Sequence, residues 1–310
     1  MTNLQTVTLG LGLLGASVGA IGALAVVRRQ GLQGDAISHA ALPGVAIAFL
    51  LGAVSPLWVA FGGAVAGWLA MWLVGAITKH SRVPFDSALA GALAVFFGFG
   101  LVLMTYLQKL VGREAQEGWE QTVRPHAQEA FRQGLDRYLF GQAALLSTED
   151  VQLFAVFGVV AAAVILSFWK DIQLFCFDPD FARSLGRPVG VVQFLLTTLL
   201  VFTVVLGLRS VGVVLMSALL IAPTVAARAW TTRLSHVVLF ASVVGACSGV
   251  GGVLLSHYAS QPGATLPTGP TVVLVASLST IVSLAFGVNG GWLRPRQRVA
   301  VGLPSEPRPQ

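Results

Sequence analysis

Charged residues are scarce in this chain of 310 residues. Asp, Glu, Lys and Arg make up 10% of the sequence, whereas an ordinary soluble domain contains about 25%. Hydrophobic residues make up 55%, and several apolar runs approach the roughly 20 residues that a helix needs to cross a bilayer. The shortage of charge therefore excludes an ordinary soluble protein and predicts an all-α, polytopic bundle of transmembrane helices.

Cysteine and lysine are also rare, and each shortage argues against a class of function. The two cysteines are Cys176, in a polar connection, and Cys247, in an apolar run, which disfavours a disulfide framework or a thiolate metal site. The three lysines are Lys79, Lys109 and Lys170, and none lies in a glycine-rich phosphate loop. We therefore expect no ATP hydrolysis by this chain, no other enzyme activity and no permanently bound cofactor.

About nine apolar stretches, or at least eight, are predicted to span the membrane. They cover residues 7–27, 36–54, 57–78, 87–108, 150–169, 188–207, 211–230, 235–256 and 269–288. Together they form one predicted transmembrane domain over residues 1–293. Residues 294–310 contain four prolines and four arginines and are predicted to be a disordered cytoplasmic tail.

The positive charges indicate how the bundle is oriented. With the N-terminus outside and the spans alternating, 13 of the 19 Lys and Arg residues face the cytoplasm and six face outward. Five of those six lie in one long loop, and long loops have little influence on topology. We therefore predict a bacterial inner-membrane protein with its N-terminus outside and its C-terminus inside. This topology accounts for most of the net charge of +6, so no nucleic-acid partner is implied.

The long loop, residues 110–149, is the most polar part of the chain before the tail. Its Glu114, Glu117, Glu120, His126 and Glu129 are spaced as in a partly helical external segment. A solvated surface helix is the plainer interpretation of such a charge run, and a metal-gathering segment is the alternative.

Small residues recur four positions apart within three of the spans. The pairs are Gly15 and Gly19, Gly63 and Gly67, and Gly245 and Gly249. This spacing predicts that helices approach one another closely in the bundle.

One acidic residue stands apart from the rest. Twelve of the 13 lie in loops, in the tail or at span edges, where Asp86 and Asp150 resemble edge or cap residues. The exception is Asp35, which precedes His39 by four positions and therefore shares a helix face with it. A carboxylate and an imidazole suit Mn²⁺, Fe²⁺ or Zn²⁺, and ionisable residues inside a membrane usually serve function. Alternatively, Asp35 is an N-cap and His39 bonds a neighbouring helix.

Nearby residues extend this hypothesis. Pro43 has no N–H to donate to the carbonyl of residue 39, so it predicts a helix break beside the pair. Two ligands do not complete a metal shell, and Ser38 and His257 are candidates for additional ligands or a gate. For His257 the plainer interpretation is a structural or surface histidine.

A second informative segment lies within a predicted cytoplasmic coupling region, residues 171–187. Asp178 followed by Pro179 is typical of a helix start, and Gly186 is typical of a stop. We predict a short exposed helix that docks on a partner, although packing against the chain's own loops is the alternative. Its residues are Asp178, Pro179, Asp180, Phe181, Ala182, Arg183, Leu185 and Gly186.

Five ordered motifs resemble the manganese/zinc/iron ABC permease family, the ABC-3 type of membrane subunit. They are residues 34–44 (GDAISHAALPG), 138–141 (YLFG), 177–186 (FDPDFARSLG), 211–223 (VGVVLMSALLIAP) and 266–271 (LPTGPT). The resemblance covers roughly residues 7–288. The 110–137 loop departs from it, being longer and more charged than is usual in the family.

The resemblance implies a permease with a fold like that of the vitamin B12-type importers. It implies a homodimer that works with two cytoplasmic ATPase subunits and an extracytoplasmic metal-binding protein. In that assembly Asp35 and His39 match the metal-coordinating positions, and residues 177–186 match the helix that contacts the ATPase. The ALPG ending of the first motif is more similar to manganese and iron members, so Mn²⁺ is the favoured ion, with Zn²⁺ or Fe²⁺ next.

Two other functions stay open at this stage. A secondary metal-ion transporter or channel without an ATPase would share the Asp35–His39 pair, but it would not need the docking helix. An ABC permease for a metal chelate or vitamin would need a wide path without such a pair.

Overall fold

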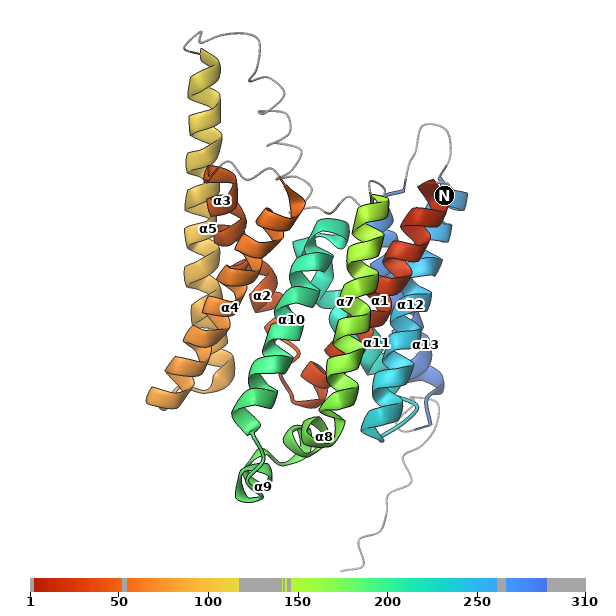
Figure 1. The fold of residues 1–310 in the computed structure, drawn as a ribbon. Coiled ribbons are helices and arrows are strands. Elements are labelled where there is room, and N and C mark those ends of the chain that lie inside the picture. Colours follow the sequence, from red (N-terminus) through yellow and green to blue (C-terminus); the bar gives the residue numbers. More distant parts are fainter. Residues whose placement is uncertain are drawn as a thin grey trace, which may run out of the picture.

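The computed structural model describes residues 3–51, 55–116, 141, 143, 146–260 and 266–288. Every regular element of any length in these ranges is a helix (Figure 1). The predicted all-α fold is therefore confirmed. The helices are α1 (Asn3–Val27), α2 (Gln33–Ala40), α3 (Leu42–Leu50), α4 (Pro56–His80), α5 (Phe85–Gln116), α7 (Thr148–Ser167), α8 (Trp169–Phe177), α9 (Pro179–Ser184), α10 (Val189–Val211), α11 (Val213–Arg228), α12 (Leu234–Ala259) and α13 (Thr268–Phe286). Most of the predicted external loop and the whole predicted tail lie outside the described residues.

The predicted count of eight to nine spans is wrong. Within the described residues seven helices, namely α1, α4, α5, α7, α10, α12 and α13, are long and apolar enough to cross a membrane. The predicted span 36–54 is instead two short helices, α2 and α3, and the predicted span 211–230 contains the 16-residue α11. At 1.5 Å per residue, α11 is about 24 Å long, against about 30 Å of hydrocarbon.

Two of these short elements, α2 and α11, are enclosed by other helices. α11 packs against α1, α2, α12 and α13, and α2 packs against α4, α5, α10 and α11. A helix surrounded by protein does not need to match the thickness of the lipid, because its ends are covered by protein groups. Hydropathy alone does not distinguish such enclosed segments from true spans.

α1 and α12 form a closely packed pair. A Cβ atom built at Gly15 would overlap the backbone of Gly245, and one built at Gly19 would overlap the backbone of Ala241. A Cβ atom at Gly249 would likewise overlap the backbone of Leu11. The predicted close approach of helices is therefore confirmed for these two glycine pairs.

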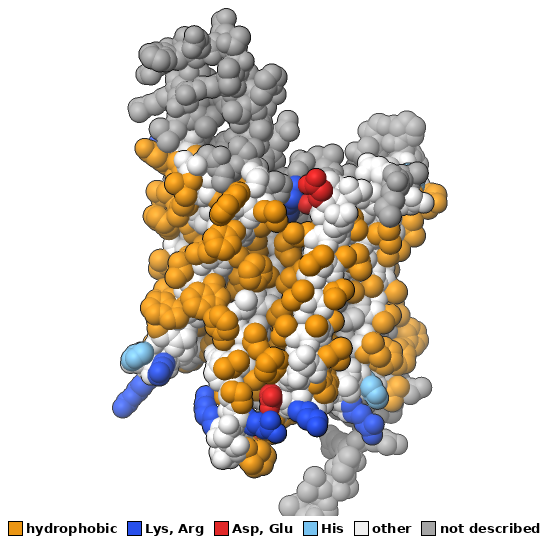
Figure 2. Space-filling view, in the orientation of Figure 1, with side chains coloured by type: hydrophobic (Ala, Val, Ile, Leu, Met, Phe, Trp, Pro, Cys, Tyr) orange, Lys and Arg blue, Asp and Glu red, His pale blue; other side chains and the backbone are white. Residues whose placement is uncertain are grey.

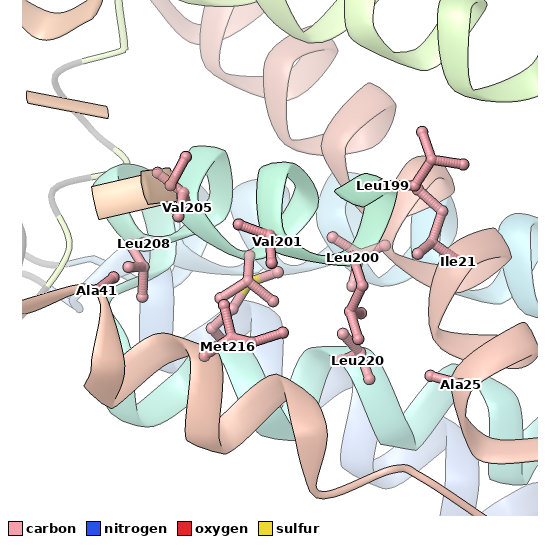
Figure 3. Close-up of a cluster of buried hydrophobic side chains, with 14 of the residues drawn as sticks. Ile21, Ala25, Ala41, Leu199, Leu200, Val201, Val205, Leu208, Met216 and Leu220 are labelled. Atoms are coloured by element: carbon pink, nitrogen blue, oxygen red, sulfur yellow. The ribbon is translucent and has the colours of Figure 1, made fainter. Parts of the chain in front are cut away.

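The core lies where α1, α10 and α11 meet the junction of α2 and α3. Figure 3 shows Ile21 of α1 beside Leu199 and Leu200 of α10, and Leu220 of α11 between Leu200 and Ala25 of α1. Ala41, the residue between α2 and α3, is fully buried at the edge of the same cluster. The broken helix is thus built into the core.

The two ends of the bundle differ in charge. The N-terminus lies at one end, and α8 and α9 lie at the other (Figure 1). Figure 2 shows apolar side chains over the middle of one face and most of its Lys and Arg side chains along the α8–α9 end. The apolar middle is the surface expected of a protein in lipid, since a bilayer provides no polar partners there.

Candidate metal site

Asp35 lies in the first turn of α2 but does not cap it. The helix begins at Gln33, two residues earlier, and its N-cap position is Leu32, which makes no side-chain cap bond. The N-cap interpretation of Asp35 is therefore wrong. The carboxylate is left available, and 38% of its side chain is exposed.

Asp35 and His39 lie side by side, as their spacing predicts. The Nε2 atom of His39 is 3.6 Å from the Oδ1 atom of Asp35, and 23% of the His39 side chain is exposed. This distance is too long for a hydrogen bond. The two side chains therefore lie within reach of one another without being joined, as two ligands of one ion would be.

The other side of the imidazole has no polar partner. The Nδ1 atom of His39 is buried and has no hydrogen-bond partner among the described residues, which counts against the alternative that His39 bonds a neighbouring helix. The ring instead meets the Phe97 ring of α5 at a centroid distance of 4.9 Å and an interplanar angle of 80°. An unpartnered buried nitrogen costs free energy, so its presence favours a role in binding.

The predicted helix break beside the pair is confirmed. α2 ends at Ala40 and α3 begins at Leu42, with Pro43 in the first turn of α3. The N–H group of Ala41 donates to the carbonyl oxygen of Ile37 at 2.9 Å, and the helix does not continue regularly past this residue. Because proline lacks an N–H group, it fits the first turn of a new helix and disfavours the interior of a longer one. His39 therefore lies in the last turn of α2.

The two additional candidates differ in their surroundings. Ser38 is fully buried, and its hydroxyl donates to the carbonyl oxygen of Gly34 at 2.7 Å. His257 lies near the end of α12, where its exposed ring contacts that of Tyr258. No group of three or more His, Cys, Asp and Glu side chains in the described part of the chain could hold a metal ion, so His257 does not join Asp35 and His39. Further metal ligands would have to come from groups other than the His, Cys, Asp and Glu side chains of the described residues.

The predicted short helix is confirmed as α9. The Asp178 carboxylate accepts hydrogen bonds from the N–H groups of Asp180 and Phe181, at 3.1 and 2.9 Å, and Pro179 is the first helical residue. The helix ends at Ser184, two residues before Gly186, which adopts a φ of +71°. The positive φ at the stop is one that glycine adopts readily.

α9 has one face toward the bundle and one toward solvent. Ala182 is buried, so the alternative of packing against the chain itself holds for this residue. The side chains of Phe181 and Leu185 are 52% and 56% exposed, although both are apolar. Exposed apolar side chains on a short capped helix are typical of a contact surface.

Two further features were not predicted from the sequence. Arg209, in the last turn of α10, makes a 2.6 Å ion pair with Asp150 of α7, which also forms a capping box with Ser147. Asp150 was expected to be a cap, but no local sequence signal linked it to Arg209. At the opposite end of the bundle the guanidinium of Arg28 lies 4.5 Å from the centre of the Phe175 ring of α8.

The Arg28 contact brings a cation close to Cys176. Burial raises the pKa of the Cys176 thiol to about 11, and the nearby Arg28 charge partly opposes this rise. Burial also lowers the pKa of the Arg28 guanidinium. Arg28, the residue after α1, is thereby in contact with α8, immediately before α9.

Comparison with known proteins gives the same assignment along nearly the whole chain. Residues 1–287 match the model of the ABC 3 transport family. The zinc transport system membrane protein TroC of Treponema pallidum is 39% identical over 291 residues, which cover 94% of this chain and 91% of that protein. The manganese transport system membrane protein MntC of Bacillus subtilis is 40% identical over 283 residues, which cover 91% of this chain but 60% of that protein.

The fold also matches a solved structure. PsaBC from Streptococcus pneumoniae, in complex with Fab, superposes with a TM-score of 0.76 at 26% identity, covering 94% of this chain and 95% of the solved one. The family model, these relatives and the solved structure thus each match more than 90% of the chain. This multi-pass membrane protein belongs to the ABC 3 transport family.

Proposed function

We propose that this chain is the membrane-spanning permease subunit of an ATP-driven importer of divalent transition-metal ions. The observation that carries the proposal is the Asp35–His39 pair, partly buried at a helix break, in which Nδ1 of His39 has no hydrogen-bond partner among the described residues. Relatives named for zinc and for manganese transport support the choice of substrate class. Mn²⁺ is the favoured ion, and Zn²⁺ and Fe²⁺ are the alternatives.

The proposed site is completed by a second copy of the chain. In a homodimer, two carboxylates and two imidazoles would face one ion and offset much of the cost of removing its water. An extracytoplasmic binding protein would deliver the ion to the end of the bundle that holds the N-terminus. The basic α8–α9 end would face the cytoplasm of a bacterial inner-membrane protein, in line with the positive-inside rule.

Energy coupling is assigned to α9. Each of two cytoplasmic ATPase subunits would contact the exposed Phe181 and Leu185 side chains, and the Asp178 cap would keep α9 folded during the contact. ATP binding and hydrolysis would move α9 and so shift the pathway from outward to inward access. Separation of the two Asp35–His39 pairs would then release the ion.

The rival functions fit less well. A secondary transporter or channel does not require an exposed apolar helix such as α9. A chelate or vitamin importer does not require a carboxylate–imidazole pair in its path. Ligand chemistry alone favours zinc over manganese, so the ion that is actually carried would depend on the binding protein and on metal supply.

The test is ATP-dependent uptake of Mn²⁺, Zn²⁺ and Fe²⁺ into vesicles that contain the permease, its ATPase and its binding protein. We expect Asp35→Asn and His39→Gln to reduce uptake to background while the ATPase still co-purifies. Asp86→Asn and His236→Gln are matched controls, because both residues are exposed and lie outside α2. Normal uptake by both α2 variants would remove Asp35 and His39 from the ion path. Wild-type uptake without ATP would instead favour the channel or secondary transporter.

A further inference from the structure

One face of α5 lies against the broken helix. α5 packs on both α2 and α3, and its residues Phe97 and Gly100 are three positions apart, so they share a face. Phe97 meets His39 of α2, and Gly100 meets Leu42 and Pro43 at the start of α3. This single face therefore contacts both sides of the helix break.

Nδ1 of His39 lacks the hydrogen bond that the second nitrogen of most metal-bound histidines makes, and among the described residues the ring contacts Phe97. A histidine ligand usually donates its second N–H to a carboxylate, a carbonyl or a water molecule, which fixes the orientation of the ring. Here Nδ1 of His39 has no such partner, and Nε2 is 3.6 Å from Asp35. The T-shaped contact with Phe97, a favoured arrangement of aromatic rings, is the specific ring contact that orients this imidazole.

Gly100 sets how closely α5 approaches the break. A Cβ atom at this position would lie 3.0 Å from both the Cβ of Leu42 and the Cδ of Pro43, and 3.1 Å from the nitrogen of Pro43. Such contacts are tighter than ordinary packing allows, so any side chain would push the helices apart by a few tenths of an ångström. Because Phe97 is one turn away, it would move away from His39 with α5.

We propose that Phe97 and Gly100 are positioning residues that tune the ion affinity of the Asp35–His39 site. Phe97 holds the imidazole in one orientation, and Gly100 keeps α5 close enough for it to do so. The inference rests on the proposed function, since it requires that His39 binds the ion. Loss of the aromatic contact frees the ring to rotate, so the imidazole spends less time in the binding orientation.

The expected effect is on binding rather than on turnover. Changes in the groups that orient a metal ligand typically weaken affinity by 10- to 100-fold, and we expect about tenfold for Phe97→Leu. The KM for the ion should rise by a similar factor, while kcat at saturating ion stays close to the wild-type value. A purely structural role would instead lower kcat and yield together.

The first measurement is Co²⁺ binding by the full-length permease in detergent, followed by the visible absorption bands that report ligand number and geometry. The second measurement is KM and kcat for ion uptake. The variants are Phe97→Leu, Phe97→Tyr, which keeps the ring, and Gly100→Ala. Matched controls on the same helix are Phe99→Leu and Gly98→Ala. Phe99 is 53% exposed, and a Cβ atom at Gly98 would meet no atom within 4 Å. If Phe97→Leu fails to fold, Phe97→Met replaces it.

The proposal is supported if Phe97→Leu and Gly100→Ala bind Co²⁺ more weakly and with an altered spectrum. Phe97→Tyr and the two control variants should then bind Co²⁺ as the wild type does. Wild-type binding by Phe97→Leu or Phe97→Met, while His39→Gln loses binding, overturns the positioning role and leaves the proposed function intact. Wild-type binding by both His39→Gln and Asp35→Asn overturns the site itself, and the positioning role with it.

Discussion

The α1–α12 pair and the α2–α3 break are both in the core, but they are built in opposite ways. In α1 and α12, glycines bring two continuous helices together until their backbones touch. In α2 and α3, one apolar stretch is interrupted at Ala41, and side chains from α4, α5, α10 and α11 surround the interruption. The touching backbones of α1 and α12 leave these helices no space to shift relative to one another. The α2–α3 break carries a polar atom without a partner, at His39.

The difference indicates how this bundle combines a rigid frame with a responsive site. Packed glycine faces give stability in lipid, where the hydrophobic effect between helices is absent. A broken helix gives up part of that stability, but it allows side chains on one half to move relative to the other half. The four predictions below test this contrast, from the largest expected effect to the smallest.

The largest effect is expected for Gly15→Ala. The added Cβ atom would overlap the backbone of Gly245, and neither helix can yield without moving the other. We expect the free energy of unfolding of the purified protein to fall by about 3 kcal/mol or more, because overpacking against backbone is costly. Gly91→Ala is the control, since a Cβ atom there would meet nothing within 4 Å. Equal stability of the two variants would show that α1 and α12 are not a rigid pair.

The next effect concerns the Arg209–Asp150 ion pair, which links α10 to α7. Arg209→Met leaves Asp150 mostly buried and without its cation, and removing one member of a buried pair costs roughly 3 kcal/mol. The exposed Arg183–Asp180 pair on α9 is a matched control at nearly the same distance, 2.7 Å. Arg183→Met should change stability by less than about 1 kcal/mol. Equilibrium unfolding in detergent measures both changes, and similar losses would contradict the assigned difference in burial.

Pro43→Ala should separate stability from transport. Alanine restores an N–H group and permits α2 and α3 to join, so we expect stability to change by less than about 1 kcal/mol while ion uptake falls severalfold. Pro84→Ala, at an exposed position before α5, is the control. The measurement pairs thermal unfolding with ATP-driven uptake. Full uptake by Pro43→Ala would show that the break is not needed for transport.

The smallest effect tests the contact between Arg28, the residue after α1, and α8. With Cys247 replaced by serine, alkylation reports only Cys176, whose thiol pKa is raised to about 11 from 9.0. The thiolate fraction at neutral pH is therefore about a hundredfold below that of an ordinary cysteine, and the labelling rate should keep rising with pH up to about 11. Arg28→Gln removes the opposing cation and should raise the pKa further. A labelling midpoint near 9 would show that the Cys176 thiol is not buried, and an unchanged midpoint in Arg28→Gln would show that Cys176 is not held against Arg28.

Much of the fold could be predicted from the sequence, because long apolar runs and the caps at their ends are local signals. Each of the seven long helices overlaps one predicted span, although most extend a few residues beyond it, and Asp178, Pro179 and Gly186 correctly marked the start and stop of α9. The span count failed at residues 36–54 and 211–230. Apolar composition there reflects enclosure by other helices as well as contact with lipid, and sequence patterns do not separate the two.

In the candidate site, too, local sequence signals were predictive and contacts between distant helices were not. The spacing of Asp35 and His39 fixed their shared helix face, and Pro43 indicated the break. The N-cap interpretation of Asp35 failed because the start of α2 depends on its packing rather than on a local capping signal. The roles of Phe97 and Arg209 depend on which helices become neighbours, with residues 39 and 97 far apart in the sequence and brought together only by the fold.

The enclosure of α2 also has a consequence for how the protein is made. A helix of eight residues that includes Gln33, Asp35 and His39 is too short and too polar to leave the translocation channel for lipid on its own, since an aspartate in a membrane helix costs about 3 kcal/mol during insertion. Its neighbours α10 and α11 are synthesised about 150 residues later. The proposed metal site would therefore be completed late in biogenesis, once the second half of the chain has arrived to shelter it.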